Sequence, residues 1–169
     1  MNDTRDENTL NIEDNADFDL SCFFPYLVRI YYRAVSTAVS DVYTKSYGMS
    51  VSEWRTMAVL GLQKSLSASE IVARSSMDKV NVSRAIKALQ ARGFLKRQID
   101  QIDKRKISLK LTDKGNAAFK DLISKVTKVE ENCLSGLSDE EQDTLITLMG
   151  RVQNNAEKLV QIKIQQARK

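Results

Sequence analysis

The chain has 169 residues, a net charge of +4, and a composition of 42% hydrophobic and 28% charged residues. This composition is ordinary for a globular protein, and no apolar run is long enough to span a membrane. Because there is no histidine, His-based triads and His metal sites are excluded, and no glycine-rich phosphate loop is present. We therefore expect no enzyme, no cofactor and no metal site. The polar start lacks the features of a signal peptide, which predicts a cytoplasmic protein.

The charge is unevenly distributed along the chain. Residues 1–20 contain seven acids and one base, whereas residues 64–114 contain thirteen Lys and Arg and five acids. We expect residues 1–18 to form an acidic flexible tail. The basic middle segment predicts an anionic partner, and nucleic acid is the commonest one, although a solvated basic surface would have the same composition.

A long first helix is predicted from about Leu20 to Gly48, because apolar residues recur there at helical spacing. Pro25 allows two interpretations. The helix either starts near Phe24, with the proline in its first turn, or is kinked one turn in.

Three shorter helices follow. Capping-box sequences begin at Ser50 (SVSE) and at Ser67 (SASE), and each predicts a helix start. The third helix begins at about Asp78 and ends at Gly93, with a basic residue in its last turn.

Two strands and two long helices complete the chain. The stretches 94–98 and 106–111 alternate as strands do, and the charged segment between them predicts a β-hairpin. A long helix opens at Thr112, and a further capping box at Ser138 opens the last one. The predicted fold class is therefore mainly α with a small β-hairpin wing.

The middle of the chain has the pattern of a winged helix-turn-helix. Two short helices joined by a tight turn are followed by a basic hairpin, and the second helix carries hydrogen-bonding and cationic side chains near its start. Such side chains can contact base edges and phosphates, and an arginine at a hairpin tip can enter the minor groove. The predicted DNA-binding residues are Ser67, Ser69, Asp78, Lys79, Asn81, Ser83, Arg84, Lys87, Arg97, Asp103, Lys104, Arg105 and Lys106.

Specific sequence pieces resemble the MarR family of bacterial transcriptional regulators. They are SRAIKALQARGFLKR in the helix predicted from Asp78 and the strand after it, Asp103-Lys104-Arg105 in the wing, and LTDKG after the wing. The resemblance covers about residues 20–160. It implies a homodimer, usually a repressor, that leaves DNA when it meets a small ligand or when a cysteine is oxidised.

The resemblance and the apolar stripes together give the expected domain organisation. Residues 49–112 form the winged helix-turn-helix, and residues 19–48 and 113–169 form a helical dimerisation region. The last two helices carry more apolar surface than the winged core alone could cover, although packing within one chain is the alternative. A twofold dimer would bind a palindrome-like site.

The sequence suggests a small-molecule switch near the first helix. The segment FFPYLVRI resembles the first helix of family members that respond to aromatic acids, including hydroxycinnamate-pathway regulators. An aromatic acid or its coenzyme A thioester is the expected effector, although a solvated helix face would give the same spacing of polar residues. The predicted ligand-binding residues are Tyr26, Arg29, Arg33, Tyr47, Trp54 and Met57.

Two alternatives remain open. Cys22 lies where the organic-hydroperoxide sensors of this family keep their reactive cysteine, which suggests a redox switch. However, residues 51–62 contain no tyrosine of the kind that tunes those sensors. The second alternative is a winged-helix adaptor that does not bind DNA, since a fold does not determine a function.

Overall fold

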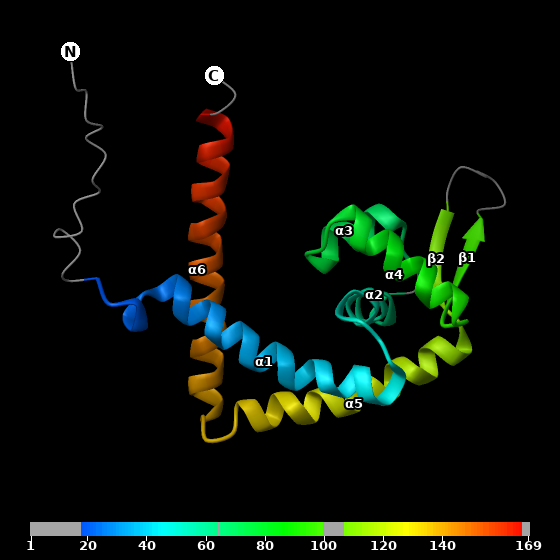
Figure 1. Cartoon of the computed structure of the whole chain (residues 1–169), viewed down its shortest axis with the longest axis horizontal. Coiled ribbons are helices and arrows are strands. Elements are labelled where there is room, and N and C mark those ends of the chain that lie inside the picture. Colours follow the sequence, from blue (N-terminus) through cyan, green and yellow to red (C-terminus); the bar gives the residue numbers. More distant parts are fainter. Residues whose placement is uncertain (1–17, 64, 100–106, 167–169) are drawn as a thin grey trace, which may run out of the picture.

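The computed structural model describes residues 18–63, 65–99 and 107–166 (Figure 1). The described chain is mostly helical with a two-stranded antiparallel hairpin, which confirms the predicted fold class. In chain order the elements are a short 3-10 helix (Leu20–Cys22), α1 (Phe24–Tyr47), α2 (Val51–Gly61), α3 (Ala68–Ser75), α4 (Lys79–Ala91), β1 (Leu95–Ile99), β2 (Ile107–Leu111), α5 (Asp113–Cys133) and α6 (Asp139–Gln166).

The first helix begins at Phe24, so the first of the two interpretations of Pro25 is confirmed. Pro25 occupies the first turn, where its missing N–H has no helical partner to lose. The helix ends at Tyr47 because Gly48 adopts a left-handed conformation, with φ of 57°.

Side-chain caps set the starts of the other helices. Ser50 and Ser67 each complete a full capping box with the glutamate three residues on. The Thr112 hydroxyl accepts from the N–H of Gly115, and Ser138 forms a capping box with Glu141. These starts all match the prediction, because a cap depends on residues only three positions apart.

The hairpin pairs Leu95 with Leu111 and Arg97 with Leu109. The first strand begins one residue later than predicted, because Phe94 lies in the turn after α4. Its ring instead packs edge-on against Tyr47, with the ring centroids 6.1 Å apart. Lys106, the predicted start of the second strand, lies outside the described residues. Leu66 adds a single bridge to Leu109, which anchors the hairpin to the segment before α3.

All the buried residues of the described chain lie between residues 43 and 122, a region that we call the winged lobe. Its core includes Met57, Leu60 and Leu89, each almost completely inaccessible to solvent. The lobe consists of α2, α3, α4 and the hairpin, together with the adjoining ends of α1 and α5, which run alongside each other (Figure 1).

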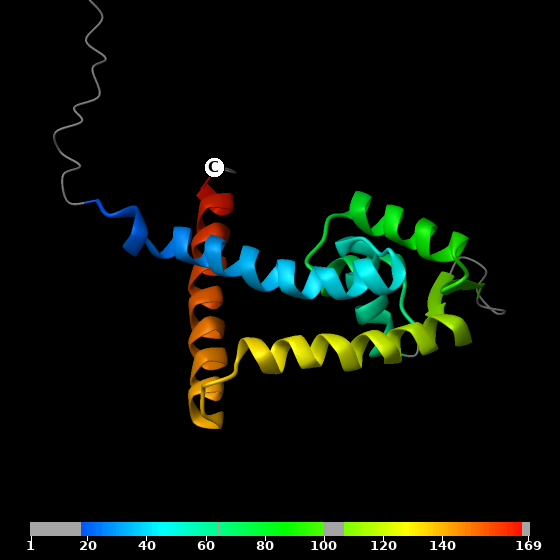
Figure 2. The ribbon, with the colours of Figure 1, turned by 60° about the horizontal axis from the view of Figure 1, so that its bottom comes forward.

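The rest of the described chain extends away from the lobe. We call residues 18–35 and 137–166 the arms. Helix α6 crosses the N-terminal half of α1 steeply, as Figure 2 shows, and none of its described side chains is buried. Among the helices of the described ranges, none contains an apolar stretch that could span a bilayer.

Candidate DNA-binding surface and effector cavity

The two helices α3 and α4 pack through their apolar sides. Ile71 of α3 and Val82 and Leu89 of α4 are almost fully buried, as the helix-turn-helix pattern predicts. The tight turn between them depends on Ser76, which has φ of 54° and ends α3 in a left-handed conformation. This packing fixes which side of α4 remains outside.

The outer side of α4 carries the predicted recognition residues. Val82 and Leu89 face inward, so positions 80, 84 and 87 lie on the opposite side of a helix with 3.6 residues per turn. Arg84 and Lys87 are exposed there. Lys79, Asn81 and Ser83 are also exposed, so the structure brings this predicted set together on one helix.

Asp78 caps α4 and also holds Asn81. One carboxylate oxygen accepts from the Asn81 N–H and the other from the Asn81 side-chain amide, each at 2.7 Å. The backbone hydrogen bond from Asn81 is the largest influence on the Asp78 carboxyl, and it helps to hold the pKa below its ordinary value. Asp78 is therefore ionised and positions its neighbour, while the Asn81 side-chain oxygen stays available.

A groove of about 590 Å³ separates α3 and α4 from the hairpin. Its lining includes Ser69, Ser83, Lys87 and Arg97, so the wing strand and the recognition helix present polar groups to the same space. Ser67 lies at the start of α3, where its hydroxyl and backbone N–H are both bonded to Glu70. The predicted wing-tip residues Asp103, Lys104, Arg105 and Lys106 lie outside the described residues.

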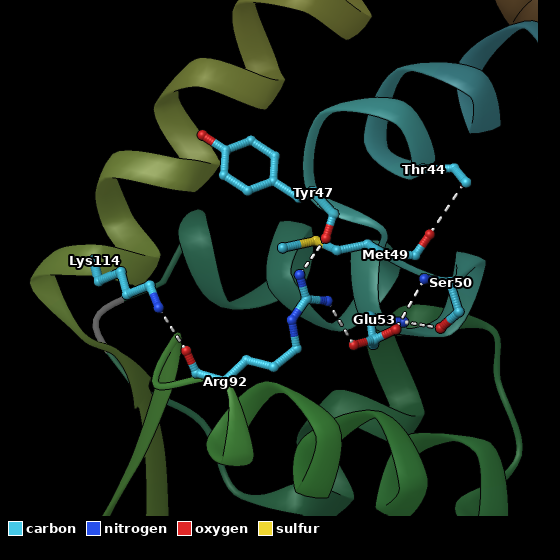
Figure 3. A network of polar contacts seen from close by, with 7 residues as sticks. All are labelled: Thr44, Tyr47, Met49, Ser50, Glu53, Arg92 and Lys114. Carbon is cyan, nitrogen blue, oxygen red and sulfur yellow. Dashed lines mark hydrogen bonds and ion pairs between the residues drawn. The ribbon is translucent and has the colours of Figure 1, made fainter.

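Arg92 connects the end of α4 to the junction between α1 and α2 (Figure 3). Its guanidinium donates to the Glu53 carboxylate, with Nη1 and Oε1 3.2 Å apart, and to the backbone oxygen of Tyr47. Lys114 of α5 donates to the Arg92 backbone oxygen at 2.9 Å. The sequence predicted Arg92 only as a basic residue near a helix end. Its partners are 39 and 45 residues away, and no local pattern indicates them.

Glu53 is the buried member of this network. Burial alone would raise the pKa of its carboxyl, but hydrogen bonds from the Ser50 N–H and hydroxyl and from Arg92 outweigh it and lower the pKa. The same carboxylate therefore completes a helix cap and an ion pair between two helices.

A second cavity lies between α1, α2 and α6. It has a volume of about 350 Å³ and is lined mainly by apolar and aromatic groups, with one cation, Arg55. The Arg55 Nη2 lies 3.4 Å from the hydroxyl of Tyr32. Trp54 stacks on Tyr43 at one wall, with ring centroids 5.8 Å apart. The lining residues are Val28, Tyr31, Tyr32, Val35, Ser36, Val39, Tyr43, Val51, Trp54, Arg55 and Met149.

Of the six predicted ligand residues, this cavity includes Trp54. Tyr26, Arg29 and Arg33 are exposed on α1 outside its lining, and Met57 is fully buried in the lobe core. Tyr47 packs against Phe94, and burial together with hydrogen bonding to Asp121 raises the pKa of its hydroxyl. Arg55, which directly follows the predicted Trp54, was not among the predicted residues.

Cys22 lies in the short 3-10 helix before α1 and is exposed. Its sulfur is 3.9 Å from the hydroxyl of Ser21. Cys133, at the end of α5, is also exposed.

The winged lobe matches a known family of regulators. The sequence model of the MarR family matches residues 47–106. The chain is 32% identical to the uncharacterized HTH-type transcriptional regulator YkoM of Bacillus subtilis, over 73% of this chain and 81% of that relative. The chain belongs to the MarR family.

Members of the MarR family are DNA-binding transcriptional regulators, not enzymes. The HTH-type transcriptional repressor YetL of Bacillus subtilis is 31% identical, over 66% of this chain and 68% of its own. Among solved structures, Bordetella bronchiseptica BpsR, whose DNA binding is regulated by 6-hydroxynicotinic acid, shares the fold. Its TM-score is 0.72 at 20% identity, over 80% of this chain and 96% of that one.

Proposed function

We propose that the protein is a dimeric repressor that binds a palindrome-like DNA site through α4 and the wing. The main support for this proposal is the outer side of α4, which exposes Arg84, Lys87 and Asn81 while the opposite side is buried. Arginine can read guanine by two parallel hydrogen bonds, whereas lysine is suited to phosphate. The name of its relative YetL favours repression.

Binding to duplex DNA, measured by fluorescence anisotropy at several salt concentrations, tests the DNA assignment. Arg84→Lys keeps the charge and loses the planar fork, so sequence preference should fall while the salt dependence remains. Lys87→Gln should reduce the slope of log affinity against log salt by about one and leave the preference unchanged. If both variants bind like the unchanged protein, the assignment of α4 is wrong. If the unchanged protein binds no duplex, the adaptor alternative gains support.

The arms supply the proposed dimer interface. Large hydrophobic side chains are exposed along residues 18–32 and 137–162, and Val51, Leu62, Val80 and Ile123 are the other described members of that set. An apolar surface of this extent indicates association, and a twofold dimer would place two α4 helices about one DNA turn apart. Inserting five base pairs, half a turn of DNA, between the half-sites should therefore abolish tight binding. If the protein binds the original and the lengthened site with equal affinity, the two lobes bind independently.

The cavity between α1, α2 and α6 is the proposed effector site. A planar acid would place its ring against Trp54 and Tyr32 and its carboxylate against the Arg55 guanidinium, which can bind both oxygens. Residues of an arm and of the lobe line the same cavity, so a bound effector would change the orientation of the arm relative to the lobe. BpsR, whose DNA binding responds to an aromatic acid, supports this class of effector.

Thermal-shift screening of aromatic acids and their coenzyme A esters tests the effector. At 100 times its dissociation constant, a ligand should stabilise the protein by about 2.7 kcal/mol. Arg55→Gln should remove the response, whereas Arg29→Gln and Arg33→Gln should keep it. If Arg29→Gln or Arg33→Gln removes the response instead, the site lies on the outer side of α1. If no acid acts and peroxide releases DNA unless Cys22 is replaced by serine, the switch is redox.

A further inference from the structure

Val80 has an unusual environment for a large aliphatic residue. Its side chain is 57% exposed, although it lies within the winged lobe, where apolar side chains are otherwise largely buried. Among the described residues between 43 and 122, the other two exposed large hydrophobic residues are Val51 and Leu62. Both lie on α2, at its first position and just after its end. Within α4, all of which the structure describes, Val80 is the one large hydrophobic residue that is exposed.

Val80 lies on the outer side of α4, opposite the buried residues. Val80, Arg84 and Lys87 follow each other at spacings of four and three residues, so they form one row. Val82, only two positions further, faces the core and is 1% exposed. Packing within the chain therefore does not require an aliphatic group at 80. Helix propensity does not favour valine either, because its branched side chain is restricted in a helix.

We propose that Val80 reads the 5-methyl group of a thymine in the major groove. This inference rests on the proposed DNA binding by α4. The thymine methyl is the apolar group that base edges present in that groove, and small aliphatic side chains contact it. Arg84, one turn away, would fix the register on the neighbouring bases. Asn81, the residue after Val80 on α4, donates its side-chain amide to Asp78.

The test removes that methyl group and nothing else. The unchanged protein first selects a consensus duplex from a random-sequence library. Affinity is then measured for this duplex and for versions in which each symmetric pair of thymines is replaced by deoxyuridine. Replacing the thymine that Val80 contacts in both half-sites should lower the affinity about fifteenfold, since each of the two lost methyl groups accounts for about fourfold.

The variant Val80→Ala completes a double-mutant cycle. It should bind the consensus more weakly than the unchanged protein and should show no further loss with deoxyuridine at that position. Leu62→Ala, the same kind of truncation at an exposed site off α4, should keep the full deoxyuridine loss. Circular dichroism melting should show that both variants are folded.

Two results would overturn the inference while leaving DNA binding intact. One is a consensus in which no thymine shows a methyl effect. The other is a Val80→Ala variant that retains the same deoxyuridine loss as the unchanged protein at every position. If no consensus is selected at all, the proposed DNA binding itself fails.

Discussion

The winged lobe and the arms contain similar apolar side chains but bury them differently. In the lobe, Leu60 and Leu89 are 1% and 0% exposed, whereas Leu159 in α6 is 62% exposed. The lobe therefore has a core of its own, and the arms keep an apolar surface that one chain does not cover. This difference indicates that local packing holds the DNA-reading unit, while association would hold the arms.

The strongest test of this difference truncates one leucine in each region. Leu89→Ala removes fully buried atoms and should lower the free energy of unfolding by about 2–5 kcal/mol. In the Val152→Asp background, which should separate the two chains, Leu159→Ala should change it by less than about 0.5 kcal/mol, because its side chain is 62% exposed within one chain. Fluorescence of Trp54, the single tryptophan of the chain, reports unfolding of the lobe. Equal losses would show that lobe and arms share one core.

A glycine pair sharpens the same comparison. A Cβ at Gly115 would lie 2.0 Å from the backbone oxygen of Phe94, so Gly115→Ala must displace either α5 or the end of α4. We expect a loss of about 2–3 kcal/mol in denaturant unfolding. Gly150, in α6, has no heavy atom within 4 Å of such a Cβ. Gly150→Ala should instead stabilise α6 by about 0.5–1 kcal/mol. A comparable loss at Gly150 would contradict the open environment of α6.

The ion pair inside the lobe has a matched control. Glu53 and Glu70 both close capping boxes, but Glu53 also binds Arg92. Glu53→Gln keeps a residue suited to the cap and should cost about 1–2 kcal/mol through the lost pair. Glu70→Gln should cost clearly less, because Glu70 is exposed. Equal effects would mean that the cap alone matters.

The pH dependence follows from the same carboxyl group. The folded-state pKa of Glu53 is lowered from its ordinary value of 4.5. Its contribution to stability is therefore complete above 4.5 and is lost as the pH falls through the folded-state pKa. Glu53→Gln should reduce the slope of stability against pH in that acidic range, measured by urea unfolding at a series of pH values. An unchanged slope would show that the network does not couple to protonation.

The smallest expected effect concerns the orientation of Asn81. Asp78→Asn preserves the helix cap, since asparagine caps as well as aspartate, but it removes the carboxylate oxygen that holds the Asn81 amide. Thermal stability should change little, while the base preference at one position per half-site should shift by a few fold. Library selection with both proteins measures this shift. Identical preferences would show that Asp78 acts only as a cap.

The elements that the sequence predicted well depend on short-range chemistry. The caps at Ser50, Ser67 and Ser138 and the strand alternation can be recognised within a few residues. The inward side of α4 was also predictable, because Val82 and Leu89 share a helical period. These features establish the fold class and the candidate DNA-binding row.

The features that the sequence did not indicate depend on distant packing. A helical period identifies an apolar stripe on α1, but it does not say which helix covers that stripe. The polar line at Arg29 and Arg33 was therefore predicted as the ligand side, whereas Arg55 of α2 lines the cavity. Likewise, Arg92 and Glu53 meet across 39 residues, and only the three-dimensional arrangement reveals the pair.

Sedimentation equilibrium tests most directly the claim that the arms join two winged lobes. The unchanged chain, of 19.1 kDa, should sediment at twice that mass at micromolar concentration. Val152→Asp, which places a charge on the apolar side of α6, should sediment as a monomer whose Trp54 unfolding is unchanged. A monomeric unchanged chain, or a Val152→Asp variant that remains fully dimeric, would contradict this account.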